Sequence, residues 1–377
     1  MPDNGSKTTE PNISWDLGTA YDMFVSLQVL HEPSTFGLRA AWAAGMRSRL
    51  PVTERETLEQ LQKAKMAMPL HWIYELPNPK DGAAALRALK EMAPEKRLET
   101  LTLSPGDPQS FEQILMDVRQ KGTWDDSQLE ELISEAKKMH GGEQIQREAV
   151  EIALDLWTEA EVSGEKLLKA LRAYYEVFFA EEENRIRPAI EEGLERAQNL
   201  AESLSLLDLL EELSQGVILE EGFKTPNLVL TPSFWGSPLL IFDQVAEDRE
   251  IILFGARPLE ASLVPGEVVP DALLRGLKAL SDSTRLRILR YLSEEALTPS
   301  QLSRRLRLRS STVVHHLHIL RLATLVQFRT GEHGKDQRYA VRPDAVASLL
   351  GSLDIFLGQG EAIEVEPLPV EAEASGD

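Results

Sequence analysis

The sequence has no cysteine among its 377 residues. Disulfide bonds, cysteine zinc sites and thiol nucleophiles are therefore excluded, and chains without disulfides are typical of the cytoplasm. The sequence also lacks a run of about 18 apolar residues, the length that a membrane helix needs. Residues 1–14 are polar and contain no apolar stretch of a signal peptide. We therefore expect a cytoplasmic protein without a membrane partner.

Short catalytic motifs are missing as well. The sequence contains no G-x-G-x-x-G, G-x-S-x-G or H-E-x-x-H. Residues 216–225 (GVILEEGFKT) come closest to a phosphate-binding loop, but five residues separate the two glycines and Phe223 precedes the lysine. Glu220 and Glu221 would also repel phosphate. We therefore expect no enzyme activity and no bound cofactor.

Positive charge is scarce overall but concentrated in one segment. The formal net charge is −21, yet residues 271–345 carry fourteen Lys and Arg against seven Asp and Glu. That segment has a charge of +7, which leaves −28 for the rest of the chain. A basic module on an acidic body is what local attraction to phosphate groups requires. This distribution indicates a nucleic-acid-binding segment near the C-terminus.

The hydrophobic pattern changes along the chain. Residues 1–12 are typical of a disordered lead, and helical periodicity dominates from there to about residue 215. Short aliphatic runs near 227–255 predict a small antiparallel sheet of at most three strands. We predict a mainly α fold with small β elements: a mostly helical N-terminal domain at 13–262, a second domain at 271–357 and an acidic disordered tail at 358–377.

The second domain shows a recognisable order of elements. Two helices are expected at 271–280 and 281–295. The next begins at Thr298, because an N-cap threonine, Pro299 and Gln301 are three helix-start features in agreement. A brief turn leads to a helix that contains RSSTVVHHLHIL, and two alternating strands follow. Helix, helix, helix, turn, helix and hairpin predict a winged helix-turn-helix.

These segments resemble the ArsR-type bacterial transcription regulators. The resemblance is carried by residues 280–292, 297–308 and 310–326 and by the hairpin, or wing. It implies a homodimer that binds a two-fold-related operator in double-stranded DNA, with a recognition helix from each subunit in successive major grooves. It also implies that the helices at 271–280 and 344–358 form the dimer.

The upstream region bears a second, weaker resemblance. Residues 21–50 and 228–242 are similar to the long, poorly characterised domain that precedes the winged helix in some ArsR-type regulators. This implies a sensing or dimer-organising region, with an effector of unknown identity.

Some positions depart from the family pattern. Val314 stands where a polar residue is common, and Arg309 and Ser310 replace a serine-glutamine pair. Base contacts are therefore expected to differ, with Val314 positioned for a thymine methyl group. The chain lacks the family's metal-sensing cysteines, and its last helix has no histidine. We expect no metal site.

Three histidines lie close together in the expected recognition helix. At 100° per residue, Val313, Val314, Leu317 and Leu320 share one face, which we predict to be buried. His315 and His318 lie largely opposite. Metal binding and catalysis remain as other interpretations, but no carboxylate or nucleophile is suitably spaced. The candidate DNA-contacting residues are Gln301, Arg304, Ser310, Ser311, Thr312, Val314, His315, His318, Arg321, Arg329, Lys335 and Arg338, with an ordinary solvated surface as the alternative for each.

The sequence thus predicts a dimeric, sequence-specific DNA-binding transcription regulator, a repressor whose N-terminal domain modulates operator binding. Three other interpretations stay open: a winged helix that docks a protein, an N-terminal scaffold without a ligand, and an enzyme fused to a regulator. The aromatic residues of the N-terminal region could line an apolar ligand pocket or fill the core. They are Trp15, Tyr21, Phe24, Trp42, Trp72, Tyr74, Phe234 and Trp235.

Overall fold

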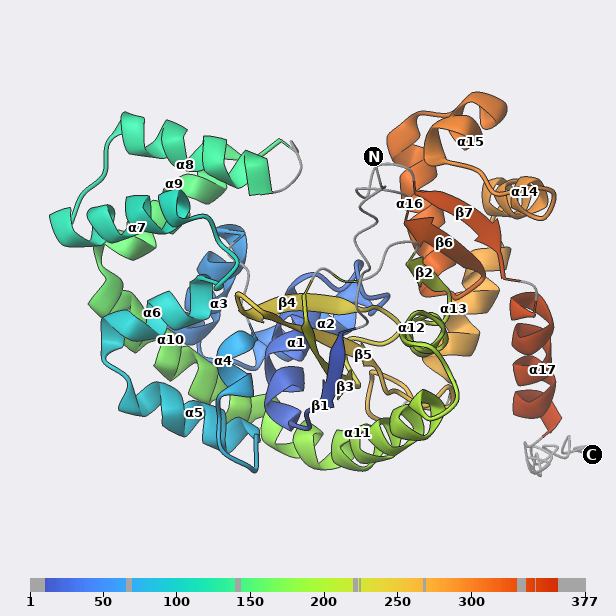
Figure 1. Ribbon diagram of the computed structural model, residues 1–377, viewed down its shortest axis with the longest axis horizontal. Coiled ribbons are helices and arrows are strands. Elements are labelled where there is room, and N and C mark those ends of the chain that lie inside the picture. Colours follow the sequence, from blue (N-terminus) through green and yellow to red (C-terminus); the bar gives the residue numbers. More distant parts are fainter. Residues whose placement is uncertain are drawn as a thin grey trace, which may run out of the picture.

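The computed structural model describes residues 11–65, 70–139, 144–219, 223, 225–266, 269–330, 337–342 and 344–358. Most of these residues are helical, and two small sheets accompany the helices, so the predicted mainly α fold with small β elements is confirmed. Figure 1 shows a central sheet, a group of helices at one end of the molecule and the winged helix at the other. The predicted disordered segments lie almost entirely outside the described residues.

Helices make up most of the region before the winged helix. They are α1 (Thr19–His31), α2 (Ala40–Ser48), α3 (Val52–Lys63), α4 (His71–Tyr74), α5 (Gly82–Glu91), α6 (Pro94–Thr102), α7 (Gln109–Lys121), α8 (Asp126–Met139), α9 (Arg147–Thr158), α10 (Ala160–Tyr174), a π-helical turn (Tyr175–Phe179), α11 (Ala180–Ala201) and α12 (Leu206–Ser214). In Figure 1, α7, α8 and α9 stand together, far from the winged helix.

The central sheet differs from the prediction. Its strands are β1 (Asn12–Trp15), β3 (Asn227–Ser233), β4 (Ile241–Ala246) and β5 (Arg249–Gly255), in the order β1-β3-β5-β4. Only β4 and β5 are antiparallel, whereas β3 runs parallel to both β1 and β5. The prediction of an antiparallel sheet with at most three strands was therefore wrong.

The parallel strands β3 and β5 are buried on both faces of the sheet. Val229 and Leu253 face one hydrophobic cluster, and Leu228 and Phe254 face another on the opposite side of the sheet. Strands that are covered on both faces have continuous apolar sequences and are typical of parallel pairing. Such runs do not reveal the strand direction. In addition, β1 comes from the edge of the segment that was expected to be a disordered lead.

The winged helix contains the predicted elements. Its helices are α13 (Asp271–Leu280), α14 (Ser283–Leu292), α15 (Pro299–Leu306), α16 (Ser310–Leu322) and α17 (Ala345–Gly358), and its antiparallel hairpin is β6 (Val326–Thr330) with β7 (Arg338–Val341). The hairpin gains a third strand from upstream, because β2 (Val217–Leu219) pairs in parallel with β6. A separate hydrophobic cluster fills this part of the molecule.

Aromatic residues of the N-terminal region mostly fill its core. Tyr21, Phe24 and Trp235 are almost completely buried. Trp42 is stacked with Trp235 at a centroid separation of 6.5 Å, and Phe24 meets Trp72 edge to face at 5.4 Å. Such contacts are typical of packed interiors. Of the two interpretations of these aromatics, the structure favours the core.

Candidate nucleic-acid interface

Helix α15, which precedes α16, has a defined start and a defined end. The Thr298 hydroxyl accepts a hydrogen bond from the Gln301 backbone at 3.3 Å, and the Gln301 side chain accepts one from the Thr298 backbone at 2.8 Å. This is the predicted capping box, and Pro299 occupies the first turn. At the other end, Arg307 adopts a left-handed conformation that stops α15. The Oε1 atom of Gln301, a candidate DNA contact, is thus engaged in the cap.

The first half of α16 presents a continuous exposed surface. Val313, Leu317 and Leu320 are buried beneath it. The surface consists of the exposed residues Ser310, Ser311, Val314 and His315, with the half-buried Thr312 beside them. We call these five residues the reading patch.

Val314 corrects one part of the helical-periodicity prediction. Its side chain is 49% exposed, although it was assigned to the buried face. The buried stripe is narrower than predicted in the first half of α16, where Val313 and Leu317 are buried but Val314 is not. The exposed position does suit contact with a groove.

The side chain of His316 packs beside the N-terminus of α14. Its Nδ1 atom lies 4.0 Å from a carboxylate oxygen of Asp282, the residue that caps α14 by accepting a hydrogen bond from the Arg285 backbone. Burial lowers the pKa of His316, while Asp282 raises it in part. A mostly neutral ring therefore fills this corner at neutral pH.

The second half of α16 is in contact with the N-terminal region. Arg321 is buried and donates hydrogen bonds to the backbone oxygens of Ser214 at 2.6 Å and Gln215 at 3.3 Å. Burial and then the neighbouring Arg342 lower the pKa of Arg321 to about 10. The prediction that Arg321 contacts DNA conflicts with this position, since its guanidinium is already buried and bound.

His318 is half-buried on the same half of α16. Its ring hydrogen-bonds with the backbone of Thr35, in the loop between α1 and α2, and burial lowers its pKa. The same loop approaches α13 at Gly37, where an added Cβ would lie 2.7 Å from Cδ of Arg275. His318 therefore lies outside the reading patch.

Basic side chains flank the reading patch. Arg304, Arg307 and Arg309 are exposed around the turn between α15 and α16. Arg305 is paired with Glu295 at 2.7 Å and is less free. Arg304, Arg307 and Arg309 belong to one basic run, RRLRLR, whose arginines suit phosphate contacts, with a solvated surface as the alternative.

The wing supplies a second group of cations. Arg329 and Arg338 are exposed and lie opposite each other in the pairing of β6 with β7. Lys335 lies outside the described residues. Arg329 and Arg338 are therefore available to contact phosphates next to the reading patch.

The described residues contain no cluster of three or more His, Asp or Glu side chains that could hold a metal ion. His315 and His316 lie side by side with a ring separation of 6.1 Å, but His316 points to Asp282. The rings of His315 and His316 are therefore not directed at a common metal position.

A family model described as a helix-turn-helix domain matches residues 280–327. This range includes α14, α15 and α16, and the reading patch lies on the last of them. No curated protein and no solved structure matches the chain. Among the described residues, no helix is both long and apolar enough to span a membrane. A helix-turn-helix places its second helix in the major groove of DNA, so the match indicates a DNA-binding regulator rather than an enzyme.

Proposed function

We propose that the protein is a sequence-specific transcription regulator of the ArsR type, which binds double-stranded operator DNA as a homodimer in the cytoplasm. The observation that carries this proposal is the reading patch, an exposed polar surface with one apolar residue on the second helix of a helix-turn-helix. The winged helix at 271–357 would bind DNA. The mostly helical region at 13–262 would modulate that binding in response to an effector, and the DNA-bound form would be a repressor.

Specificity comes from the few side chains that can reach base edges. His315 and Ser311 offer hydrogen-bonding groups, and Val314 offers methyl groups for a thymine. Arg304 and Arg309, with Arg329 and Arg338 in the wing, would hold phosphates and so set the position of α16 in the groove. His318 and Arg321 would act instead by fixing α16 to the N-terminal region.

The last helix supports the proposed dimer. Leu350, Ile355 and Leu357 of α17 are 53%, 57% and 68% exposed. Figure 1 shows α17 standing away from the rest of the molecule, with α13 as its neighbour. Large apolar side chains on a protruding helix are typical of a surface that is covered by a partner. A two-fold contact through α17 would use the same apolar surface on both subunits.

Fluorescence anisotropy tests the proposal with duplex DNA from upstream of the gene. We expect His315→Ala to lower specific affinity by about 5- to 150-fold, the effect of about 1–3 kcal/mol for a lost base contact. Arg304→Gln should weaken binding to specific and unrelated DNA alike. Arg87→Gln is the control, because Arg87 is exposed on α5 in the N-terminal region.

Two results would count against the proposal. One is a wild-type protein that binds neither specific nor unrelated duplex at low salt. The other is unchanged specific affinity in His315→Ala, which would exclude His315 from the base contacts and contradict the role given to the reading patch.

A further inference from the structure

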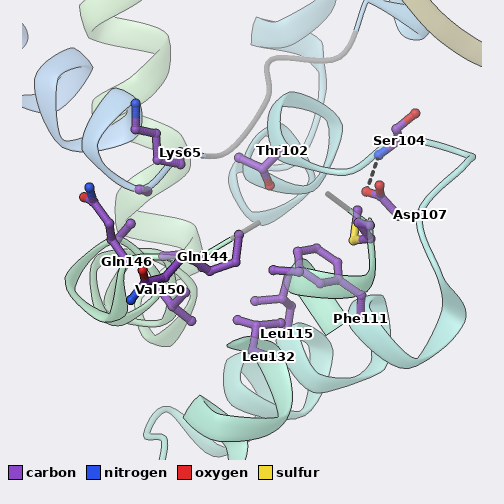
Figure 2. A pocket seen from close by; sticks show the side chains of 16 residues that line it. Lys65, Thr102, Ser104, Asp107, Phe111, Leu115, Leu132, Gln144, Gln146 and Val150 are labelled. Carbon is purple, nitrogen blue, oxygen red and sulfur yellow. Dashed lines mark hydrogen bonds between the residues drawn. The ribbon is translucent and has the colours of Figure 1, made fainter. Parts of the chain in front are cut away.

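A cavity of about 430 Å³ lies in the N-terminal region, at the end of the molecule away from the winged helix. It opens between the end of α3, the segment after α6, and helices α7, α8 and α9 (Figure 2). Its volume is about three times that of a ~150 Å³ apolar cavity that holds benzene, and it lies in the usual range of small-molecule sites.

The floor of the cavity is apolar. It is formed by Phe111 and Leu115 of α7, Leu132 of α8 and Val150 of α9, and Figure 2 shows these side chains gathered at its base. Leu115, Leu132 and Val150 are buried and belong to the main hydrophobic core. Small alanines of α8 and α9 complete the lining and leave the space open. A ligand must therefore present a largely apolar body.

The rim carries an unneutralised acid. Asp107 accepts a hydrogen bond from the Ser104 backbone at 2.8 Å but forms no ion pair with another described residue. Burial, and then the nearby carboxylate of Asp243, raise the pKa of Asp107. Burial and then Asp107 raise the pKa of Glu112, on the first turn of α7. Burial is the main cause of both shifts, and the neighbouring carboxylates add to it, whereas His71 lowers the pKa of Asp107 in part.

Among the described residues, Lys65 is the lysine that lines the cavity, and His71 is the titratable base near Asp107, with a pKa that burial lowers. Lys65 lines the opposite side, but its Nζ lies 3.3 Å from Glu32, and in Figure 2 its amino end points away from the cavity. Gln144 and Gln146 contribute neutral amides on that side. Within the described part of the lining, an anionic ligand would meet Asp107 with no lysine or arginine directed at it, whereas a cationic ligand would form an ion pair with Asp107.

We propose that this cavity binds an apolar organic cation, an alkylamine that carries two or three aromatic rings, with its ammonium group at Asp107 and its rings over Phe111, Leu115 and Leu132. The ammonium would donate to the free carboxylate oxygen of Asp107. The apolar body would displace water from the floor. As an effector site, this inference rests on the proposed function; as a binding site, it stands on the cavity alone.

The rim of the cavity is hydrogen-bonded to the central sheet through Ser104 and Asp243. Asp243 of β4 accepts hydrogen bonds from the Ser104 hydroxyl at 3.1 Å and from the backbone of Leu70 at 2.5 Å and His71 at 3.1 Å. Strand β4 pairs with β5, which leads through residues 256–270 to α13 of the winged helix. A ligand at Asp107 would therefore act next to a residue of the central sheet.

Isothermal titration calorimetry of the full chain tests the site with three probes of one shape: 1-naphthylmethylamine, 1-naphthalenemethanol and 1-naphthoate. We expect the amine to bind at least about tenfold more tightly than the naphthoate, because a hydrogen-bonded charge pair contributes about 1.5–3 kcal/mol. Asp107→Asn keeps an acceptor for Ser104 and should remove that preference, with little effect on the alcohol. Asp117→Asn on α7 is the matched control.

A second variant tests the location. Ala136 of α8 is half-buried in the lining, so Ala136→Phe should fill the cavity and abolish binding of all three probes without lowering the melting temperature. Ala88→Phe, at a half-buried position on α5, should bind as the wild type does. Equal binding of amine and naphthoate, amine binding by Ala136→Phe, or no binding of any probe would overturn the proposal.

The same titration repeated with operator DNA separates this inference from the proposed function. Selective amine binding with altered DNA affinity supports both. Selective amine binding with unaltered DNA affinity supports the site and contradicts modulation by the N-terminal region. Loss of DNA binding in His315→Ala does not depend on either outcome.

Discussion

At the scale of single residues, Asp22 is the polar side chain that joins α1 to the end of β3. It is completely buried and accepts hydrogen bonds from the Ser233 hydroxyl at 2.8 Å, the Phe234 backbone at 3.0 Å and the Trp235 backbone at 2.8 Å. Both carboxylate oxygens are used. Three donors therefore depend on one side chain in the interior.

Asp22→Asn should destabilise the protein. In the variant an amide NH₂ group would replace one of the two carboxylate oxygens, and the N–H or O–H group that this oxygen accepts from would lose its acceptor. One unsatisfied buried group lowers the free energy of unfolding by about 1–3 kcal/mol. Urea denaturation followed by circular dichroism at pH 7 measures the change. Asp126→Asn is the control, because Asp126 is 89% exposed. Equal stability of Asp22→Asn and wild type would contradict the hydrogen-bond network.

The difference in the free energy of unfolding between the wild type and Asp22→Asn should also depend on pH. Burial is the main cause that raises the pKa of Asp22 to about 6, from an ordinary value of 3.8. Between those values the folded wild type binds a proton that the unfolded chain does not, so its free energy of unfolding rises as pH falls from 7 to 5. Asp22→Asn lacks this titration. We expect the stability gap to widen by about 1–2 kcal/mol over that range. A constant gap would show that Asp22 does not titrate there.

At the scale of secondary-structure elements, α16 is held by the end of α12 through Arg321. Arg321→Met preserves much of the side-chain volume but leaves the backbone oxygens of Ser214 and Gln215 without their donor. We expect a loss of about 1–3 kcal/mol in the free energy of unfolding and faster hydrogen exchange in α12, β2 and α16. Arg290→Met is the control, since Arg290 is 80% exposed on α14 and should change stability by less than about 0.5 kcal/mol.

The entry to β2 depends on a glycine. Gly216 has a φ of +112°, and an added Cβ would lie 3.0 Å from Cδ of Arg342 and 3.1 Å from Cβ of Gln327. Gly216→Ala should therefore lower stability by about 1–3 kcal/mol. Gly45→Ala is the opposite case, because Gly45 lies within α2 with open space around it and should gain up to about 1 kcal/mol. Thermal denaturation of the two variants compares them, and similar melting temperatures would exclude strain at Gly216.

At the scale of the whole molecule, positive charge is concentrated in residues 271–345, whereas the rest of the chain is acidic. The acidic body should disfavour indiscriminate DNA binding, while the exposed arginines around α16 attract phosphates. Specific affinity should fall steeply with salt, with log K falling by about 0.9 per log unit of salt for each phosphate neutralised. Arg304→Gln should flatten the slope by about 0.9 for each winged helix, and Arg87→Gln should leave it unchanged. Anisotropy at four salt concentrations measures the slopes, and a flat wild-type profile would contradict the phosphate contacts.

Local sequence patterns predicted the winged helix well. The capping box at Thr298, the order of α13 to α16 and the buried Val313 and Leu317 all follow from short-range rules, and they appear as predicted. The direction of β3 was missed, because an apolar run records burial but not the partner strand. The burial of Arg321 was missed for a related reason: its acceptors lie 106 and 107 residues away in the sequence. Helical periodicity cannot register a contact of that kind.

The exposed surface of α16 was predictable only in part. His315 and Ser311 were assigned to the outer face and lie there, but Val314 was placed inside and is exposed. A 100° rotation per residue sets relative directions, whereas the width of the buried stripe depends on how closely neighbouring elements approach. Whether the reading patch contacts DNA stays a prediction.

The pairing of β2 with β6 has a consequence for transplanting this regulator. A chimera that joins residues 271–358 to the N-terminal domain of another protein would lack β2. One edge of β6 would then be unpaired and exposed, and such edges promote aggregation. Residues 206–219 would have to travel with the transplanted part to close that edge. The winged helix therefore includes a strand from upstream of residues 256–270. A fusion made within those residues would separate β2 from the sheet that it completes.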